Sequence, residues 1–235
     1  MRALVVLAMI LLALSASPAQ GAAGVQLVLV ASGSTGGGTI SHGVLSVSVG
    51  VTRGDLLVVV VGINRALHPV TSVGDSMGDV FTNRTAAAYP AVAPDAWVEV
   101  WTAPVKAGGA DVVTVHTTST RDNVVVLEYA GVGGVGNVAA AGGKGTKASV
   151  YVSLKSSTSA VVAGGSTFTG SGKGCGFQGP FTGGSLERCL GTTAAKNNVG
   201  TMAMSDASVG ASGLAVSAGK TGSQSWAMAA VELMG

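Results

Sequence analysis

A serine inside a glycine-flanked pentapeptide is the first candidate for chemistry in this sequence. Gly74-Asp75-Ser76-Met77-Gly78 matches G-x-S-x-G, the turn that exposes the nucleophile of α/β hydrolases between a strand and a helix. The segment that follows, Asp79-Val80-Phe81-Thr82, has a strand pattern instead of a helical one. The histidine downstream, His116, lies within a Val/Thr-rich strand pattern. We therefore predict a hairpin turn without catalysis at Ser76, and a serine hydrolase remains the alternative.

Asp75 and Asp79 lie four residues apart in the same predicted turn. Carboxylates and neighbouring backbone carbonyls could bind Ca²⁺, which takes about six to eight oxygen ligands in proteins. Aspartates in turns also accept hydrogen bonds from nearby backbone amides. A calcium site and simple turn formation are therefore both open. No other cofactor is expected, because His42, His68 and His116 are too dispersed to predict a zinc site.

Two tryptophans and one asparagine are candidate carbohydrate-related residues. Trp97 and Trp101 have the same parity within one predicted strand, so they share a face of it. An exposed pair would form a carbohydrate-binding face, but the chain has few other large side chains and we favour a place in the core. Asn83-Arg84-Thr85 is an N-glycosylation sequence in a predicted polar loop, with Asn83 as the acceptor.

The two cysteines, Cys175 and Cys189, are fourteen positions apart. An even number of cysteines in a secreted chain indicates a disulfide. Closing a loop of about 15 residues is worth about 3 kcal/mol in the chain-entropy model. The glycine-rich segment between the cysteines has little else to hold it, so we predict a disulfide there.

The N-terminal residues 1–23 predict secretion. One arginine precedes an apolar run from Ala3 to Leu14, and small residues follow, as in a secretory signal peptide. The run is too short to span a membrane as a helix, which needs roughly 20 residues; an uncleaved anchor is the alternative. No second hydrophobic span follows, so the mature chain is expected to be extracellular or on the cell surface. The net charge of +2, without a basic cluster, gives no support for nucleic-acid binding.

The rest of the chain, residues 24–235, predicts a single all-β domain. Short Val-rich segments recur throughout, and glycine-containing pairs such as Gly142-Gly143 and Gly164-Gly165 are the predicted turns. The segment 44–49 alternates apolar and polar residues, typical of a half-buried strand, whereas 56–61 is continuously apolar, typical of a strand buried on both faces. About a dozen such strands predict one Gly-rich antiparallel β-sandwich.

Four segments resemble a jelly-roll-like domain found in secreted and phage-associated surface proteins of bacteria and archaea. They are Gly54–Val61, Val70–Thr82, Glu99–Gly109 with the later Glu128-Tyr129-Ala130-Gly131-Val132, and the closing Trp226–Leu233. The second is similar to that family's SVxDSxGNxYT hairpin, with Asp79 where the family usually has Asn. The resemblance implies a jelly-roll-like sandwich and a surface or extracellular module, and it brings no established catalytic residues.

The function predicted from these features is structural or adhesive. Only 10% of the residues are charged, against about 25% in ordinary globular proteins, and a surface of small neutral residues suits packing against another surface. The segment Val25–Val30 is an uncharged strand followed by a Gly/Ser linker at 32–38. This strand could pair within its own sheet or with a neighbouring subunit in a filament. A carbohydrate-binding module using Trp97 and Trp101 is the first alternative and a hydrolase using Ser76 the second.

Overall fold

The computed structural model describes residues 24–34, 43–63, 70–89, 95–118, 122–170, 174–191, 198–206 and 213–235. These residues form fourteen strands and no helix, which confirms the predicted all-β class. A helix able to cross a membrane is accordingly not found among them. The predicted signal peptide at residues 1–23 lies outside the described residues.

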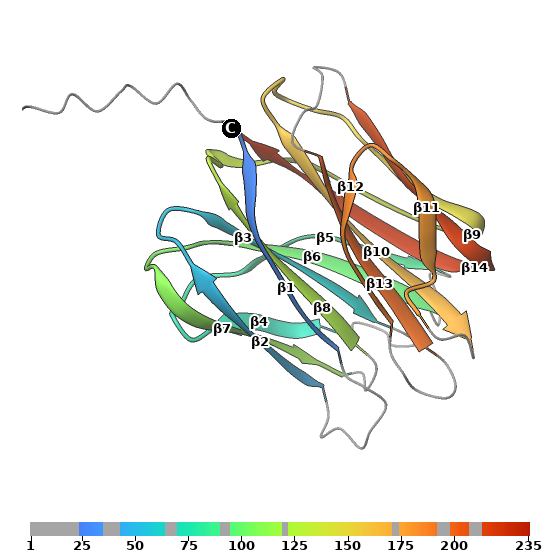
Figure 1. Ribbon diagram of the computed structural model, residues 1–235, viewed down its shortest axis with the longest axis horizontal. Coiled ribbons are helices and arrows are strands. Elements are labelled where there is room, and N and C mark those ends of the chain that lie inside the picture. Colours follow the sequence, from blue (N-terminus) through green and yellow to red (C-terminus); the bar gives the residue numbers. More distant parts are fainter. Residues whose placement is uncertain are drawn as a thin grey trace, which may run out of the picture.

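Of the fourteen strands, the first eight divide between two sheets and the last six form a third (Figure 1). They are β1 (Gln26–Ser34), β2 (Val44–Val51), β3 (Leu56–Ile63), β4 (Val70–Asp75), β5 (Thr82–Tyr89), β6 (Ala96–Pro104), β7 (Gly109–Thr117), β8 (Asp122–Ala130), β9 (Gly134–Val152), β10 (Ala160–Gly170), β11 (Phe177–Thr182), β12 (Ser185–Gly191), β13 (Asn198–Asp206) and β14 (Leu214–Met234). All their pairings are antiparallel.

Three sheets stack in layers, consistent with a β-sandwich that carries one additional sheet. Sheet A has the order β1-β8-β3-β6-β5, sheet B the order β2-β7-β4, and sheet C the order β11-β14-β10-β13-β12 with β9 paired to β14. One hydrophobic cluster lies between sheets A and B and a second between sheets A and C. Sheet A is therefore the central layer (Figure 1).

The central position of sheet A explains the continuous apolar run of β3. Val58 and Val60 pack toward sheet C, Val59 and Val61 pack toward sheet B, and none of the four is exposed. Full burial of each such side chain stabilises the fold by roughly 1.5–3 kcal/mol. The alternating sequence of β2 corresponds to one buried face, since Leu45, Val47 and Val49 are buried while the residues between them are exposed. Both burial patterns predicted from the sequence are confirmed.

Strands β9 and β14 form a long paired ribbon that bends back over sheet C. Their register shifts between Gly219 and Gln224, where Lys220 is buried and its Nζ donates to the carbonyl oxygens of Gly145 (3.2 Å) and Gln224 (2.5 Å). Burial lowers the pKa of Lys220 to about 8. Beyond the bend, Val216 and Ala218 pack on the outer face of sheet C. The ribbon thereby encloses a third hydrophobic cluster.

Two predicted turns lie inside strands, and packing explains the error. Gly142-Gly143 belongs to β9 and Gly164-Gly165 to β10. A Cβ atom on Gly164 would lie 2.5 Å from Cγ1 of Val60, and one on Gly143 would lie 2.8 Å from the ring of Trp226. These glycines allow close approach between packed strands, a role that the sequence pattern does not separate from a turn.

The N-terminal strand pairs within its own chain. β1 lies beside β8 at the edge of sheet A, from the pair Gln26 and Ala130 to the pair Ser34 and Asn123. Ser32–Ser34, the beginning of the predicted 32–38 linker, continues this strand, and residues 35–38 lie outside the described residues. The single-domain boundaries predicted at 24–235 stay a prediction.

Candidate functional site: hydrogen-bonded turns, buried carboxylates and an outer groove

Ser76 is held in a hydrogen-bond network at the end of β4. Its Oγ donates to Oδ1 of Asp111 (2.7 Å) and accepts from the backbone N–H of Val112 (3.0 Å). His116, on the same strand as Asp111, pairs with Ser72 and Val44 across sheet B, and His42 and His68 lie outside the described residues. Among the described residues, the Ser76 hydroxyl is therefore bonded to a carboxylate and not to a histidine, which supports the prediction of a turn.

We expect Ser76 to resist a fluorophosphonate probe, because its hydroxyl is bonded to Asp111 and the histidine within the described ranges, His116, pairs with Ser72 and not with Ser76. Mass spectrometry of the probe-treated protein should show no adduct on Ser76. Treated Ser76→Ala serves as the blank. A specific adduct that disappears in Ser76→Ala would contradict this prediction.

The aspartates around this turn act as acceptors for backbone amides. Oδ1 of Asp75 accepts from the N–H groups of Met77 (3.1 Å) and Asp79 (2.9 Å), and Oδ1 of Asp79 accepts from the N–H of Lys106 (3.0 Å). Burial raises the pKa of Asp75, and the negative charges of Asp111 and Asp79 raise it further. Within the described ranges, no three His, Cys, Asp or Glu side chains group to hold a metal ion. These hydrogen bonds are those of a turn, and a calcium site at Asp75 and Asp79 stays a prediction.

Trp97 and Trp101 do share a face of β6, where both flank a buried carboxylate. The indole N–H groups of Trp97 and Trp101 each donate to Glu99 at 2.9 Å, to Oε1 and Oε2 respectively. The backbone N–H of Val70 donates to Glu99 as well. Burial raises the pKa of Glu99, although these donors and Asn83 act in the opposite direction. Both rings are half-buried against the cluster between sheets A and B, which supports the core alternative.

Asn83 lies in β5, whereas the sequence predicted a polar loop. Its Nδ2 atom donates to Oε2 of Glu99 at 2.7 Å. Glycosylation modifies this same nitrogen, so a glycan would have to displace the bond. Glycosylation of Asn83 stays a prediction, and it would require the loss of the hydrogen bond to Glu99.

Glu232 in β14 is a second buried carboxylate. It binds residues that are distant in the sequence, a contact that the sequence analysis did not predict. Its two oxygens accept from the backbone N–H groups of Asn137 (2.9 Å), Lys155 (2.7 Å) and Ser156 (3.2 Å) and from the hydroxyl of Ser159 (2.7 Å). Burial alone raises the pKa of Glu232, but these four donors outweigh it and the pKa is lowered. Glu232 thus fastens the start of β9 and the β9–β10 connection to the closing strand.

Cys175 and Cys189 form the predicted disulfide, with their Cα atoms 5.4 Å apart. Cys175 precedes β11 and Cys189 lies in β12, and both pack against the outer hydrophobic cluster of sheet C. The disulfide therefore joins the residues just before β11 to β12, and these two strands also pair with β14 and β13 respectively, so more than the bond alone holds this segment.

Comparison of the chain with protein-family models, with curated proteins and with solved structures found no match in any of the three. Membership of the jelly-roll-like family that the sequence resembles therefore stays a prediction.

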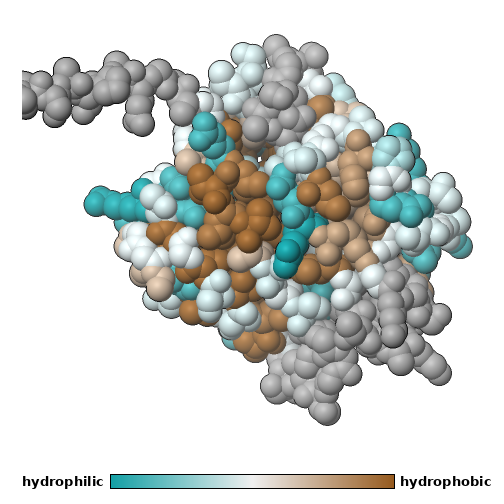
Figure 2. All heavy atoms as spheres, in the orientation of Figure 1, coloured by the Kyte–Doolittle hydropathy of each residue, from teal (hydrophilic) through white to brown (hydrophobic). Residues whose placement is uncertain are grey.

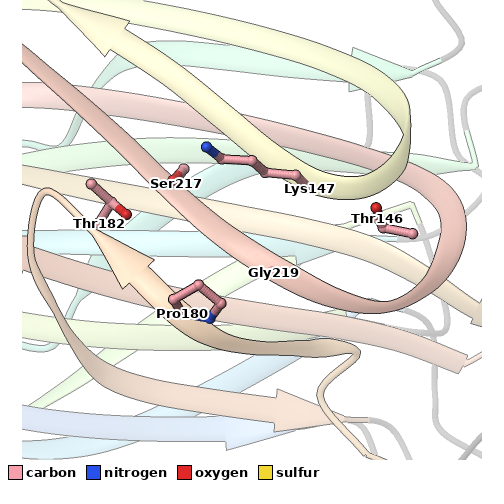
Figure 3. A pocket seen from close by; sticks show the side chains of 6 residues that line it. All are labelled: Thr146, Lys147, Pro180, Thr182, Ser217 and Gly219. Carbon is pink, nitrogen blue, oxygen red and sulfur yellow. The ribbon is translucent and has the colours of Figure 1, made fainter.

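A groove opens on the outermost layer, where the bent half of β14 lies between β9 and β11 (Figure 3). Its volume is about 200 Å³. Figure 3 shows Lys147 extending from β9 with its amino group directed toward Ser217, while Pro180 and Thr182 come from β11. The lining residues are Thr146, Lys147, Pro180, Thr182, Ser217 and Gly219. Hydroxyl groups and one ammonium group thus face a common space, a feature that the sequence analysis missed.

Proposed function

We propose that this protein is a secreted structural or adhesive component of a cell surface, which associates with copies of itself through the free edge of β1. The observation that carries the proposal is the composition of this strand. Gln26–Ser34 contains no charged residue and no proline, and β1 pairs with β8 on one side only among the described strands. Val28 is 51% exposed and Val30 37% exposed. Such an edge is a template for another strand.

Most other edge strands differ from β1 in their content of charged residues and prolines. Edge strands usually carry charges or prolines that prevent pairing with another molecule. Among the described strands, β2 also lacks them and lies beside β1, since a Cβ on Gly33 would be 3.1 Å from Cγ2 of Val47. The remaining edge strands all have them: Asp75 in β4, Arg84 in β5, Lys144 and Lys147 in β9, Pro180 in β11, and Glu187 and Arg188 in β12. Among the edge strands that the structure describes, β1 and β2 are thus the two without such residues.

A second copy of the chain is a suitable partner for β1. The β1 strand itself carries no charged residue, and a contact between two antiparallel β1 strands would cover Val28 and Val30 on both molecules. Figure 2 shows hydrophobic side chains gathered on the face that includes β1. A contact of β1 with β1 closes at two subunits, because the same surface is used twice. Longer filaments would need a second, different contact.

The compartment is inferred from two features. The N-terminal residues have the composition of a secretory signal, and disulfides persist mainly in oxidising surroundings. The disulfide between Cys175 and Cys189 supports an extracellular location.

If copies of the chain associate through β1, substitutions in that strand should convert the assembly into monomers. The mature protein should elute at a multiple of its monomer mass in size-exclusion chromatography with light scattering, and the double variant Val28→Lys/Val30→Lys should elute as a monomer with an unchanged circular dichroism spectrum. Two lysines on each strand would place like charges across the interface. The matched control is Val80→Lys, because Val80 is 64% exposed and lies outside the strands. A monomeric parent, or a double variant that still associates, would refute the proposal.

A further inference from the structure

We propose that the outer face of the layer formed by β9, β14 and β11 binds an acidic oligosaccharide, which lies in the groove at Lys147 and extends along β9 to Tyr151. This site differs from the aromatic pair that the sequence suggested. It is also independent of the β1 edge, so the two proposals can fail separately.

Tyr151 supplies the first argument. The chain has ten aromatic residues, all within the described ranges, and Tyr151 is the exposed one among them, at 58%. The side chain lies close against the neighbouring backbone, since a Cβ on Gly213 would lie 2.2 Å from the Tyr151 hydroxyl oxygen. Gly213, with φ of 139°, therefore leaves room for the ring to lie against the backbone. An exposed aromatic ring can pack against the apolar face of a sugar ring.

The strand register joins Tyr151 to the groove. Lys147, Ser149 and Tyr151 alternate with the buried Ala148 and Val150, so the three side chains share the outer face of β9. They pair in turn with Gly219, Ser217 and Ala215 of β14. Small residues therefore line the floor beside them. Four residues along a strand span about 14 Å, which gives an elongated site with an aromatic ring at one end and an ammonium group at the other.

The polar groups of the groove define the class of ligand. Thr146, Thr182 and Ser217 carry hydroxyl groups that both donate and accept hydrogen bonds, as the hydroxyls of a sugar require. Lys147 is the charged residue among those that line the groove. An ammonium group without a carboxylate in the lining favours a ligand that brings its own carboxylate. These features together fit a uronate-containing oligosaccharide better than a neutral one.

Isothermal titration with an oligogalacturonate, and with its methyl-esterified form, tests this inference on the mature protein. We expect the acidic form to bind and the ester to bind about tenfold more weakly, because the ester cannot form the charge-assisted bond to Lys147. Tyr151→Ala should weaken binding of the acidic form by about tenfold or more, whereas Tyr151→Phe should retain it. Lys147→Gln should remove the preference for the acidic form.

The control variant is Lys144→Gln, which removes an exposed lysine of the same strand that does not line the groove. Its binding should equal that of the parent. The monomeric variant Val28→Lys/Val30→Lys should also bind, so loss of association leaves this inference standing. Absence of binding by the parent, equal binding of acid and ester, or full binding by Tyr151→Ala would overturn it.

Discussion

Replacing Glu232 with alanine is expected to lower the free energy of unfolding by about 3 kcal/mol, since three partly buried amides lose their acceptor and each costs about 1 kcal/mol or more. The amides belong to Asn137, Lys155 and Ser156, and the hydroxyl of Ser159 loses the same partner. Glu232 itself is fully buried, so water cannot take its place without rearrangement. Urea unfolding followed by circular dichroism measures the difference.

Two variants make this prediction specific. Glu232→Gln keeps one side-chain oxygen as an acceptor and should lose less stability than Glu232→Ala. Glu187→Ala removes a half-buried carboxylate of β12 that accepts from the hydroxyls of Ser185 and Ser205, and it should cost less than either. If Glu232→Ala unfolds at the same urea concentration as Glu187→Ala, then Glu232 does not fasten the loop as described.

The same carboxylate predicts a dependence of stability on pH. The pKa of Glu232 is lowered in the folded protein from its ordinary value of 4.5, so folding favours the ionised form. Its stabilisation is complete above the pKa of the unfolded chain and is lost as the pH falls through the lower pKa of the folded state. Burial raises the pKa of Asp75, Glu99 and Glu128, which act with the opposite sign. The stability difference between the parent and Glu232→Gln should therefore shrink on acidification.

Reduction of the disulfide between Cys175 and Cys189 is expected to lower the free energy of unfolding by about 3 kcal/mol, the chain-entropy cost of opening a loop of about 15 residues. The effect should appear as a lower thermal midpoint in reductant, and intact mass should increase by two hydrogen atoms. The double variant Cys175→Ser/Cys189→Ser should reproduce the lower midpoint and respond to reductant no further. An unchanged midpoint after complete reduction would contradict the prediction and show that the pairing of β11 and β12 with sheet C suffices.

Local patterns determined the fold class of this protein. A strand places successive side chains on opposite faces, so the alternation of 44–49 and the unbroken run of 56–61 each specify a number of buried faces. The equal parity of Trp97 and Trp101 likewise placed both rings on one face of β6, as observed. The disulfide followed from composition alone, because the chain contains only two cysteines.

Only the tertiary structure decided which polar residues meet and which glycines pack. The partners of Glu232 are 73 to 95 positions away, and nothing in the local sequence around Asn137 or Ser159 points to this carboxylate. The sequence around Gly164 predicts a turn, and only the contact with Val60 of another sheet shows why a glycine lies within the strand. Tyr151 alternates like any half-buried strand residue, and its exposure depends on the bend that makes β9 and β14 the outermost layer. The periodicity of a strand indicates how many of its faces are buried. Contacts between residues far apart in the sequence determine which elements bury those faces and which side chains stay exposed.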